Sequence, residues 1–386
     1  MVINMDFNIL VLNIGSTSLK FKLYEITRQS IIANGQIASV FSAESEYTFE
    51  KNGIKKSGKT DTSSGYGIAL EKVFEFIGND NKISAIAFKT VMAGNINRTC
   101  ELDEKVVSKM EEYLSVAPAH NLPYINAIRE IKKLFPDIPC VGSFETAFHS
   151  TIPKYAYMYS IDSALAEKYG IRKYGFHGAA HSYAAYKLGK ENKRLISVHL
   201  GGSSSVCAIL DGKSLDTSMG FSPQSGLPMN NRCGDIDAFA LLYLMEKENM
   251  SINDAIEFLS TKCGFKGMSR ISNDMRELEK NGCDDVIEAY AYSASKYICS
   301  FLPCLGGVDA ISFSGGIAEN STLVKQKILN RLKFSGAETD DRLIALKPDK
   351  EPLLISTASS KIKIYITPVN EELMVALNTY NYLKGK

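Results

Sequence analysis

The stretch Asn13–Lys20, "NIGSTSLK", places a turn of small hydroxyl residues between two strand-like runs, "FNILVL" before it and "FKLYEI" after it. The alternation on both sides predicts a β-hairpin over residues 7–25. Glycine lets the backbone approach a ligand closely, and the N–H and hydroxyl groups of such a turn suit phosphate oxygens. Lys20 adds a positive charge. A single turn of this kind is most often a plain hairpin turn.

The same arrangement returns half a chain later, as the runs "RLISVHL", "GGSSS" and "VCAILDGKSL" over residues 194–215. A third glycine turn, Gly315-Gly316, joins the apolar strand of "DAISFS" to a helix that we expect to begin near Asn320. Two hairpin turns in matching positions of the two halves favour a nucleotide cleft between lobes. Neither a P-loop motif nor a Rossmann G-x-G-x-x-G in strand-to-helix context is present.

Helical periodicity separates these strands. It covers "GIALEKVFEFIG", "YINAIREIKKLF", "DAFALLYLMEKE" and "DDVIEAYAYSASKYICSFL". The chain ends with a strand, "IKIYITP", and a helix, "NEELMVALNTYNYL", which Asn370 is expected to cap. These patterns predict an α/β protein of two related lobes. We expect residues 1–150, with the final helix at 370–386, to form the first lobe, and residues 151–369 to form the second.

Composition narrows the range of partners. The 44 basic and 43 acidic residues leave a formal charge of +1, so no global field attracts nucleic acid or an anionic membrane. A small molecule or a second copy of the chain is the expected partner. The eight cysteines form no C-x-x-C pair and no metal-ligand spacing, which fits reduced thiols in a cytoplasmic protein. The N-terminus shows neither a signal sequence nor a membrane-spanning run.

The five histidines all fall in one window, at positions 120, 149, 177, 181 and 199. Taken singly, His149 and His181 are expected to pack or cap, and Asp235 or Asp237 to cap the helix that follows. His177 and Arg232 are stronger candidates for a site, because both lie in glycine-containing breaks between elements, where reactive side chains are usually displayed.

Nine stretches together resemble the acetate kinase family, the acyl-phosphate-forming kinases of the actin, sugar kinase and Hsp70 ATPase superfamily. They are "VLNIGSTSLKFKL", "APAHNLP", "FETAFHSTIP", "YGFHGAAHSY", "VHLGGSSSVCAILDGKSLDTSMGFSP", "NNRCGDID", "SNDMREL", "SGGIAENS" and "TPVNEELMVA". They occur in the order of the family and at about its spacing. The resemblance implies two ribonuclease-H-like lobes, each a mixed sheet flanked by helices, with a nucleotide cleft between them. It also implies reversible, ATP-dependent phosphorylation of acetate or a slightly larger acid such as propionate to an acyl phosphate.

The resemblance also implies a role for each matching residue. ATP and Mg²⁺, with Mn²⁺ as an alternative, would be the cofactors of a homodimeric enzyme. The implied catalytic residues are His177, Arg232, Glu145, Lys89 and His120, and the implied metal ligands are Asn13 and Glu371. The acyl pocket would be shaped by Val91, Ala119, Phe176 and Pro223. The nucleotide would be bound by Asn13, Ser16, Ser18, Lys20, His199, Gly201, Gly202, Asp274, Arg276, Gly315, Gly316, Ile317 and Asn320.

Several positions depart from the family pattern, among them Phe88 and Met92, which replace histidines. Lys89, in "FKTVMAG", replaces an arginine and loses its bidentate fork. Glu145 replaces an aspartate, and Gly202 stands where "HLGNG" would supply an asparagine near the nucleotide. Ala119 replaces a leucine, which would leave room in the acyl pocket for a longer acid. Two alternatives therefore stay open: a kinase for a longer or branched acid, and a nucleotide-binding paralogue with weak catalysis.

Overall fold

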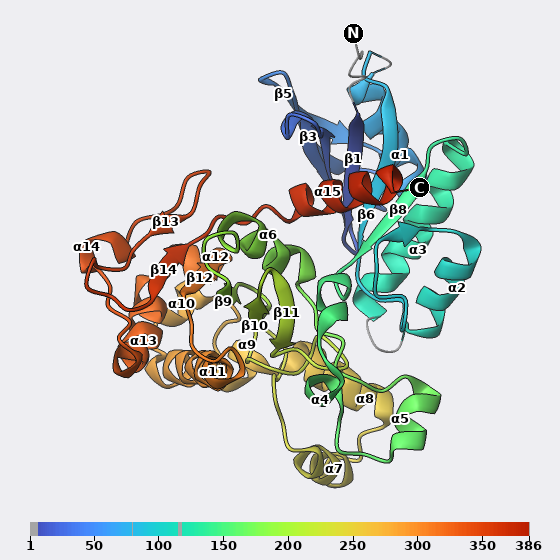
Figure 1. Cartoon of the computed structure of the whole chain (residues 1–386). Coiled ribbons are helices and arrows are strands. Elements are labelled where there is room, and N and C mark those ends of the chain that lie inside the picture. The colour runs from blue at the N-terminus through green and yellow to red at the C-terminus, as the bar shows by residue number, and fades with distance from the viewer. Residues whose placement is uncertain (1–6, 79, 115–117, 386) are drawn as a thin grey trace. The chain divides into compact units, whose positions relative to one another are not determined.

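The computed structural model describes residues 7–78, 80–114 and 118–385, without the side chains of residues 118–120. The chain divides into two compact units. Unit 1 comprises residues 1–147 and 370–386, and unit 2 comprises residues 148–369. The last helix of the chain thus belongs with the N-terminal residues (Figure 1).

Unit 1 is built on a mixed sheet with the strand order β5-β4-β3-β2-β1-β6-β8-β7. Strand β1 is buried along nearly its whole length and pairs antiparallel with β2 and parallel with β6. The strands are β1 (Asn8–Ile14), β2 (Ser18–Glu25), β3 (Ser30–Ala38), β4 (Ser45–Lys51), β5 (Ile54–Thr60), β6 (Ile83–Thr90), β7 (Cys100–Glu101) and β8 (Cys140–Phe144). The hairpin predicted over residues 7–25 is therefore confirmed.

Helices α1 and α3 of unit 1 pack on each other and on the sheet, and α15 lies across β1, β6 and β8 (Figure 1). The helices of this unit are α1 (Tyr66–Ile77), α2 (Glu104–Glu112), α3 (Pro118–Leu134) and α15 (Glu371–Lys384). Asn370 caps α15 as predicted, since its side chain accepts a hydrogen bond from the backbone N–H of Leu373.

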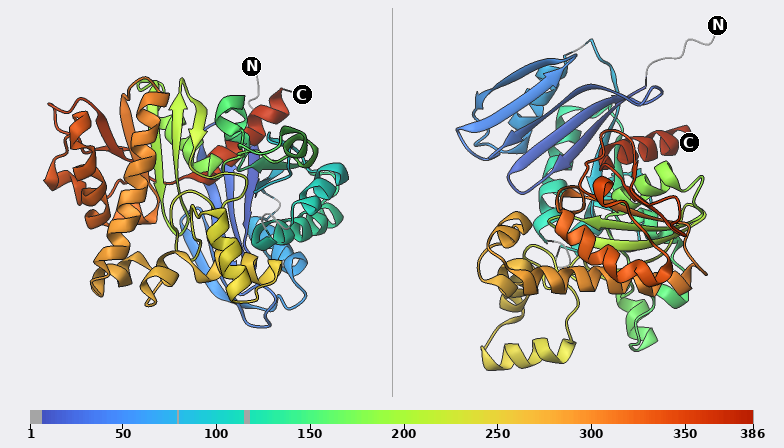
Figure 2. Two further views of the ribbon diagram at one scale, coloured as in Figure 1. Left: turned by 90° about the horizontal axis from the view of Figure 1, so that it is seen from below. Right: turned by 90° about the vertical axis from the view of Figure 1, so that its left-hand side faces the viewer.

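Unit 2 carries the second mixed sheet, with the order β11-β10-β9-β12-β14-β13. Its strands are β9 (Arg194–Leu200), β10 (Ser204–Leu210), β11 (Lys213–Thr217), β12 (Ala310–Ser314), β13 (Leu353–Leu354) and β14 (Lys363–Ile366). The long helix α11 runs beside this sheet (Figure 2) and supplies much of its apolar core, including Ile287, Tyr290 and Ile298.

The helices of unit 2 are mostly short. They are α4 (Lys154–Tyr157), α5 (Ser163–Tyr169), α6 (Gly178–Leu188), α7 (Ala238–Lys247), α8 (Ile252–Glu257), α9 (Gly264–Ser269), α10 (Met275–Lys280), α11 (Asp284–Cys304), α12 (Gly316–Asn320), α13 (Thr322–Leu332) and α14 (Asp341–Ile344). Two 3₁₀ turns (Ala147–Thr151 and Lys333–Ser335) and one π-helical turn (Phe258–Lys262) complete the regular structure. Asp237 caps α7, as predicted for that aspartate.

The two sheets share one topology. In unit 1, β3-β2-β1 are antiparallel neighbours, β6 is parallel to β1, and β8 is parallel to β6. In unit 2, β11-β10-β9 repeat the antiparallel arrangement, and β12 and β14 follow in parallel. Unit 1 extends its sheet with β4 and β5, and each unit adds one short antiparallel strand at the opposite edge. The α/β fold of two related, helix-flanked mixed sheets is thus confirmed.

Two boundaries differ from the sequence prediction. The run "VCAILDGKSL" is two strands, because Asp211 and Gly212 adopt left-handed φ angles of 48° and 77° and turn the chain between β10 and β11. The helix expected from Asn320 begins at Thr322, where the Ser321 side chain caps it. A separate short helix, α12, precedes it.

The eight cysteines are all unpaired. Over the residues that the structure describes, no helix is both long enough and apolar enough to span a membrane.

Candidate active site

The first glycine turn, between β1 and β2, is held in place by hydrogen bonds from a tyrosine of α1. Gly15 N–H donates to Ser18 O at 2.8 Å, and a Cβ on Gly15 would lie 2.5 Å from Ser18 Oγ, so a larger residue there would displace the Ser18 hydroxyl. The hydroxyl of Tyr66 on α1 donates to the carbonyl oxygens of Gly15 and Ser16. Burial raises the pKa of Tyr66 to about 12, which keeps this donor protonated. The turn is thereby fixed while Ser16 stays exposed.

The second glycine turn, between β9 and β10, repeats this support. Ser204 Oγ lies 3.3 Å from Gly201 N and 2.7 Å from the hydroxyl of Tyr290 on α11. The first and second turns are therefore each anchored by a buried tyrosine from the helix that precedes the next parallel strand, β6 or β12. This correspondence extends the shared topology to individual side chains.

The third glycine turn packs against the second. Gly315 has a φ of 88°, and a Cβ there would lie 2.6 Å from Leu200 O, so only glycine lets β12 end this close to β9. The two turns border one pocket of about 380 Å³. Its lining is Gly201, Gly202, Asn230, Asp274, Met275, Arg276, Glu279, Gly316, Ile317, Asn320 and Ser321. Seven of these were predicted to bind the nucleotide: Gly201, Gly202, Asp274, Arg276, Gly316, Ile317 and Asn320.

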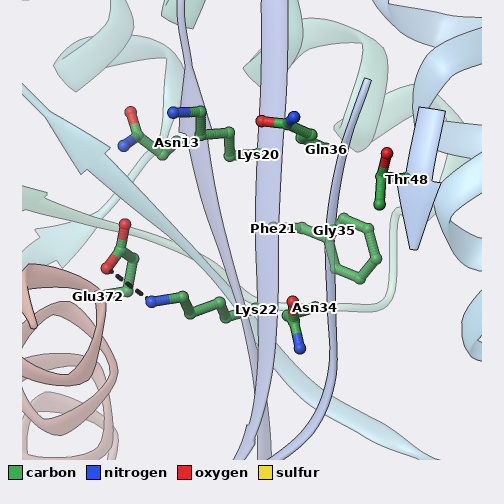
Figure 3. A pocket seen from close by; sticks show the side chains of 9 residues that line it. All are labelled: Asn13, Lys20, Phe21, Lys22, Asn34, Gly35, Gln36, Thr48 and Glu372. Carbon is green, nitrogen blue, oxygen red and sulfur yellow. Dashed lines mark hydrogen bonds and ion pairs between the residues drawn. The ribbon is translucent and has the colours of Figure 1, made fainter. Parts of the chain in front are cut away.

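Unit 1 has its own polar pocket beside the first turn, of about 240 Å³ (Figure 3). Asn13 and Lys20 are cross-strand partners and lie side by side on one row of side chains that continues to Gln36. Lys22 lies on the next row, where its Nζ is 3.1 Å from Glu372 Oε2 on α15. Lys20 is exposed and points along the same face, in a position to meet an anionic ligand.

Lys89 joins two carboxylates of unit 1. Its ammonium group, at the end of β6, forms a close ion pair with Glu371 Oε2 and lies 3.7 Å from Glu145 Oε1. All three side chains are largely buried, with 19%, 13% and 7% of their surfaces exposed. Burial alone would lower the pKa of Lys89, but the charges of Glu371 and Glu145 outweigh it and raise that pKa above its ordinary value. Lys89 is therefore a permanent cation.

His177 is the start of a relay of alternating histidines and serines in unit 2. It precedes α6 with a left-handed φ of 58°. Its Nδ1 lies 2.8 Å from Ser205 Oγ, and its Nε2 lies 2.7 Å from Ser203 Oγ. His181, one turn along α6, places Nε2 at 2.8 Å from the same Ser205 Oγ and Nδ1 at 2.9 Å from Ser197 Oγ.

This relay couples the protonation of its two histidines. A hydroxyl donates one proton, so Ser205 donates to one ring and accepts from the other. Burial lowers the pKa of His181 well below its ordinary value, so that ring stays neutral. When Ser205 donates to His181, it accepts from Nδ1–H of His177, and the Nε2 of His177 faces Ser203 on the second turn. The predicted packing role of His181 is thus a role in orienting His177.

His149 lies in the core as predicted, with Nδ1 2.8 Å from Ser214 Oγ and Nε2 2.9 Å from Phe176 O. Burial lowers the pKa of His149 to about 4, so it carries no charge at neutral pH. His199 lies with its ring centroid 4.9 Å from that of His177 and its Nδ1 3.2 Å from Ser314 Oγ.

Arg232 is a partly buried cation at the end of a rigid loop. The loop is fixed by backbone hydrogen bonds from Phe265 N to Met229 O at 2.8 Å and from Cys263 N to Asn231 O at 3.1 Å. Arg232 Nη1 donates to Pro223 O at 3.3 Å and approaches the sulfur of Met229. Burial lowers the pKa of Arg232. Across the described part of the chain, its contacts are with the carbonyl oxygen of Pro223 and the sulfur of Met229, and no carboxylate forms an ion pair with it.

The described residues hold no cluster of three or more His, Cys, Asp or Glu side chains that would bind a metal unaided. Mg²⁺ in kinases is usually held by one or two carboxylates and substrate phosphates, with water completing its shell. The Glu371 and Glu145 carboxylates and the side-chain oxygen of Asn13, which accepts from Tyr124 at 3.2 Å, are suitable donors for such an ion. The donor set therefore fits a magnesium ion that arrives with a nucleotide.

The remaining predicted residues are less informative. Val91 and Phe176 are buried, and Pro223 contacts Arg232 through its carbonyl oxygen. Ala119 and His120 belong to α3, but their side chains lie outside the described residues. Ser18 begins β2 and is half-buried. Sequence reasoning missed Ser203, Ser205, Tyr124, Asn230 and Glu372, although the first two lie within the quoted turn "GGSSS".

Comparison with known proteins identifies the family of the chain. Residues 8–377 match the model of the Acetokinase family. The chain belongs to this family. It is 38% identical to an acetate kinase of Azobacteroides pseudotrichonymphae, with 97% of this chain and 99% of that one aligned. Acetokinase family membership makes the protein an ATP-dependent kinase that phosphorylates a short-chain carboxylate.

Two solved structures of the acetokinase type are close in fold. An acetate kinase from Porphyromonas gingivalis has a TM-score of 0.87 at 31% identity, over 98% of this chain and 100% of that one. A propionate kinase from Francisella tularensis has a TM-score of 0.89 at 30% identity, over 97% of this chain and 99% of that one.

Proposed function

We propose that the protein transfers the γ-phosphoryl group of ATP, with Mg²⁺, to a short-chain acid that extends to propionate or beyond. The observation that carries this proposal is Arg232, a partly buried cation whose counter-ion is not a carboxylate of the described chain. Its planar fork suits both a carboxylate and a phosphate. The anchored glycine turns supply the second requirement, rigid donors for the phosphates of the nucleotide.

Phosphoryl transfer to a carboxylate requires positive charges in fixed positions rather than a strong base. A carboxylate oxygen of the acid attacks the γ-phosphorus, the bond to ADP breaks, and the products are an acyl phosphate and ADP. The acid is already ionised, so no proton need be removed. Arg232 and His177 would stabilise the equatorial oxygens of the transferring group, and Lys20 would meet a phosphate of the nucleotide. Glu371, with Asn13 and Glu145, would hold Mg²⁺, which neutralises charge on the phosphates when bound.

We expect propionate or a longer straight-chain acid to have a higher kcat/KM than acetate. Ala119 replaces a leucine of the family pattern, and one methylene in an apolar pocket is worth roughly 10-fold to 200-fold in specificity. The measurement traps the acyl phosphate as a hydroxamate across straight and branched acids of increasing length.

The matched variant is Ala119→Leu, which should shift preference back toward acetate. A highest kcat/KM for acetate in the unaltered protein would reject the preference for a longer acid. ATP binding without hydroxamate from any acid would favour the alternative of a nucleotide-binding paralogue with weak catalysis.

We also propose that two copies of the chain pair through helix α7 of unit 2. This helix buries none of its residues, and it projects from its unit in both Figures 1 and 2. Phe239, Leu242 and Tyr243 are 80%, 57% and 61% exposed. An apolar helix face left in water is costly, and a second copy of the same face would remove it from solvent.

The double variant Phe239→Asp with Leu242→Asp should therefore convert a dimer into a monomer, as measured by light scattering after size exclusion. Phe334→Asp is the matched control, since Phe334 is 74% exposed but stands alone in a 3₁₀ turn, and that variant should remain dimeric. A monomeric unaltered protein, or a double variant that still dimerises, would exclude this interface.

We also propose a cytoplasmic location for the protein, which the unpaired thiols fit.

A further inference from the structure

Gly202 and Asn230 compete for one space in the pocket of unit 2. A Cβ added at Gly202 would lie 3.3 Å from Asn230 Nδ2, closer than such contacts normally are. Both residues line the pocket that carries the second and third glycine turns. The amide of Asn230 therefore occupies the position into which a side chain at residue 202 would project.

The backbone of Asn230 is fixed on both sides. Its N–H donates to Gly202 O at 3.1 Å, and its carbonyl oxygen accepts from Lys266 N at 3.1 Å. The side-chain amide, in contrast, makes no hydrogen bond to any part of the chain between residues 7 and 385 that the structure describes. A rigidly mounted amide that lines a pocket is a donor prepared for a ligand.

The conformation at Gly202 does not itself demand glycine, since its φ lies outside the left-handed region. Only Asn230 restricts a side chain there. The pattern "HLGNG" places an asparagine at this position, and this chain has glycine instead. In this chain the Asn230 amide lies beside the space that a side chain at residue 202 would enter.

We propose that Asn230 binds the phosphates of the nucleotide through Nδ2–H, in place of a side chain at residue 202. The proposal rests on the proposed function, which supplies the nucleotide. Phosphate oxygens are the expected acceptors because Gly201, Gly202 and Gly316 border this part of the pocket. A Cβ added at Gly201 would lie 3.9 Å from the backbone nitrogen of Gly316, so the second and third glycine turns lie close together there. Three glycines allow the close backbone approach that a polyphosphate chain requires.

The first experiment removes the amide. Asn230→Gly should weaken ATP binding, measured by calorimetry in the absence of any acid, by about 10-fold to 100-fold, the loss expected for one hydrogen bond to a charged group. Adenosine affinity should stay unchanged, because the proposed hydrogen bond goes to a phosphate, which adenosine lacks. Asn231→Gly is the matched control, since the Asn231 side chain instead accepts from Asn273 Nδ2 at 3.1 Å.

The second experiment exchanges the two residues. Gly202→Asn alone should weaken ATP binding, because its side chain would displace the Asn230 amide from its present position. The double variant Gly202→Asn with Asn230→Gly should bind ATP within about 3-fold of the unaltered protein, since additivity fails for residues that share one space. Rescue in the double variant would show that misfolding is not the cause of the loss in a single variant. Thermal unfolding of each protein would report any misfolding directly.

Equal ATP affinity in Asn230→Gly and the unaltered protein would overturn the assignment. An equal loss for adenosine and ATP would overturn it as well, because it would place the amide on the nucleoside. Additive losses in the double variant would refute the exchange. Failure of the proposed function is separate, since it would appear as absence of acyl phosphate from every acid while these binding differences remain.

Discussion

Arg232→Ala should lower kcat/KM for carboxylate phosphorylation by about 10³-fold, the scale on which a cation that stabilises a transferring phosphoryl group contributes to the rate. The guanidinium is partly buried, its burial lowers its pKa, and its hydrogen-bond acceptor is the neutral carbonyl oxygen of Pro223. At this position no interaction within the described chain offsets the free-energy cost of desolvating the positive charge. Steady-state kinetics with the preferred acid and ATP would measure the loss.

The free energy of unfolding of Arg232 variants distinguishes a catalytic role of this side chain from a structural one. Arg232→Met removes a desolvated charge and keeps an apolar stem, so the free energy of unfolding should be unchanged or rise by about 1 kcal/mol. Arg232→Lys keeps the charge without the fork and should recover only part of the activity. A variant that loses stability in proportion to its activity would contradict the assignment.

Arg172 is the matched control for Arg232. It is also half-buried in unit 2, and burial also lowers its pKa. Its guanidinium carbon, however, lies 3.6 Å from the centre of the Tyr157 ring, and its Nε donates to Lys173 O. Arg172→Met should therefore lose stability through the lost cation–π contact and leave kcat/KM close to that of the unaltered protein.

The features that could be predicted from the sequence are those with local causes. The strands of the first hairpin alternate around a glycine turn, α11 carries a helical apolar period over its whole length, and Asn370 precedes two glutamates at the start of α15. Each of these patterns depends on neighbours only a few residues apart. The turn at Asp211-Gly212 has a local cause as well, because D-G between two strand-like runs is a hairpin signal, and the prediction of one strand does not include it.

The contacts that assemble the site could not be predicted in this way. The pairing of Lys89 with Glu371 joins β6 to the start of α15 across most of the chain, and the sharing of Ser205 by two histidines depends on how α6 packs on β9. Sequence indicated that Lys89 and Glu145 depart from the family pattern. It did not indicate that one lysine would neutralise two carboxylates.

Lys89→Met should lower the free energy of unfolding of the protein by about 3 to 5 kcal/mol at neutral pH, the typical cost of removing one partner from a buried ion pair. The side chains of Glu371 and Glu145 are only 13% and 7% exposed, and the variant deletes the cation that forms an ion pair with each. Lys89→Arg, which keeps the charge, should keep most of the stability. Chemical denaturation of the three proteins measures the difference.

The pH dependence gives this prediction its sharpest form. The raised pKa of Lys89 means that its contribution is fully present below the ordinary pKa of lysine and is lost only as the pH rises through the folded value. In the unaltered protein, the contribution of Lys89 to the free energy of unfolding should therefore stay constant between about pH 5 and pH 8. In Lys89→Met the buried carboxylates favour protons more in the folded than in the unfolded chain, so the variant should regain stability as the pH falls over that interval.

A second substitution decides whether charge is the cause. Lys89→Met with Glu371→Gln removes one carboxylate charge along with the lysine, and it should recover a large part of the lost stability and flatten the pH dependence. Loss of packing around the lysine stem would instead leave the double variant as unstable as the single one at every pH. Glu371 and Glu145 lie close in sequence to the two points where the chain passes between unit 1 and unit 2. If the double variant recovers stability, the charge of Lys89 holds both of these segments in unit 1, in addition to its place in the site.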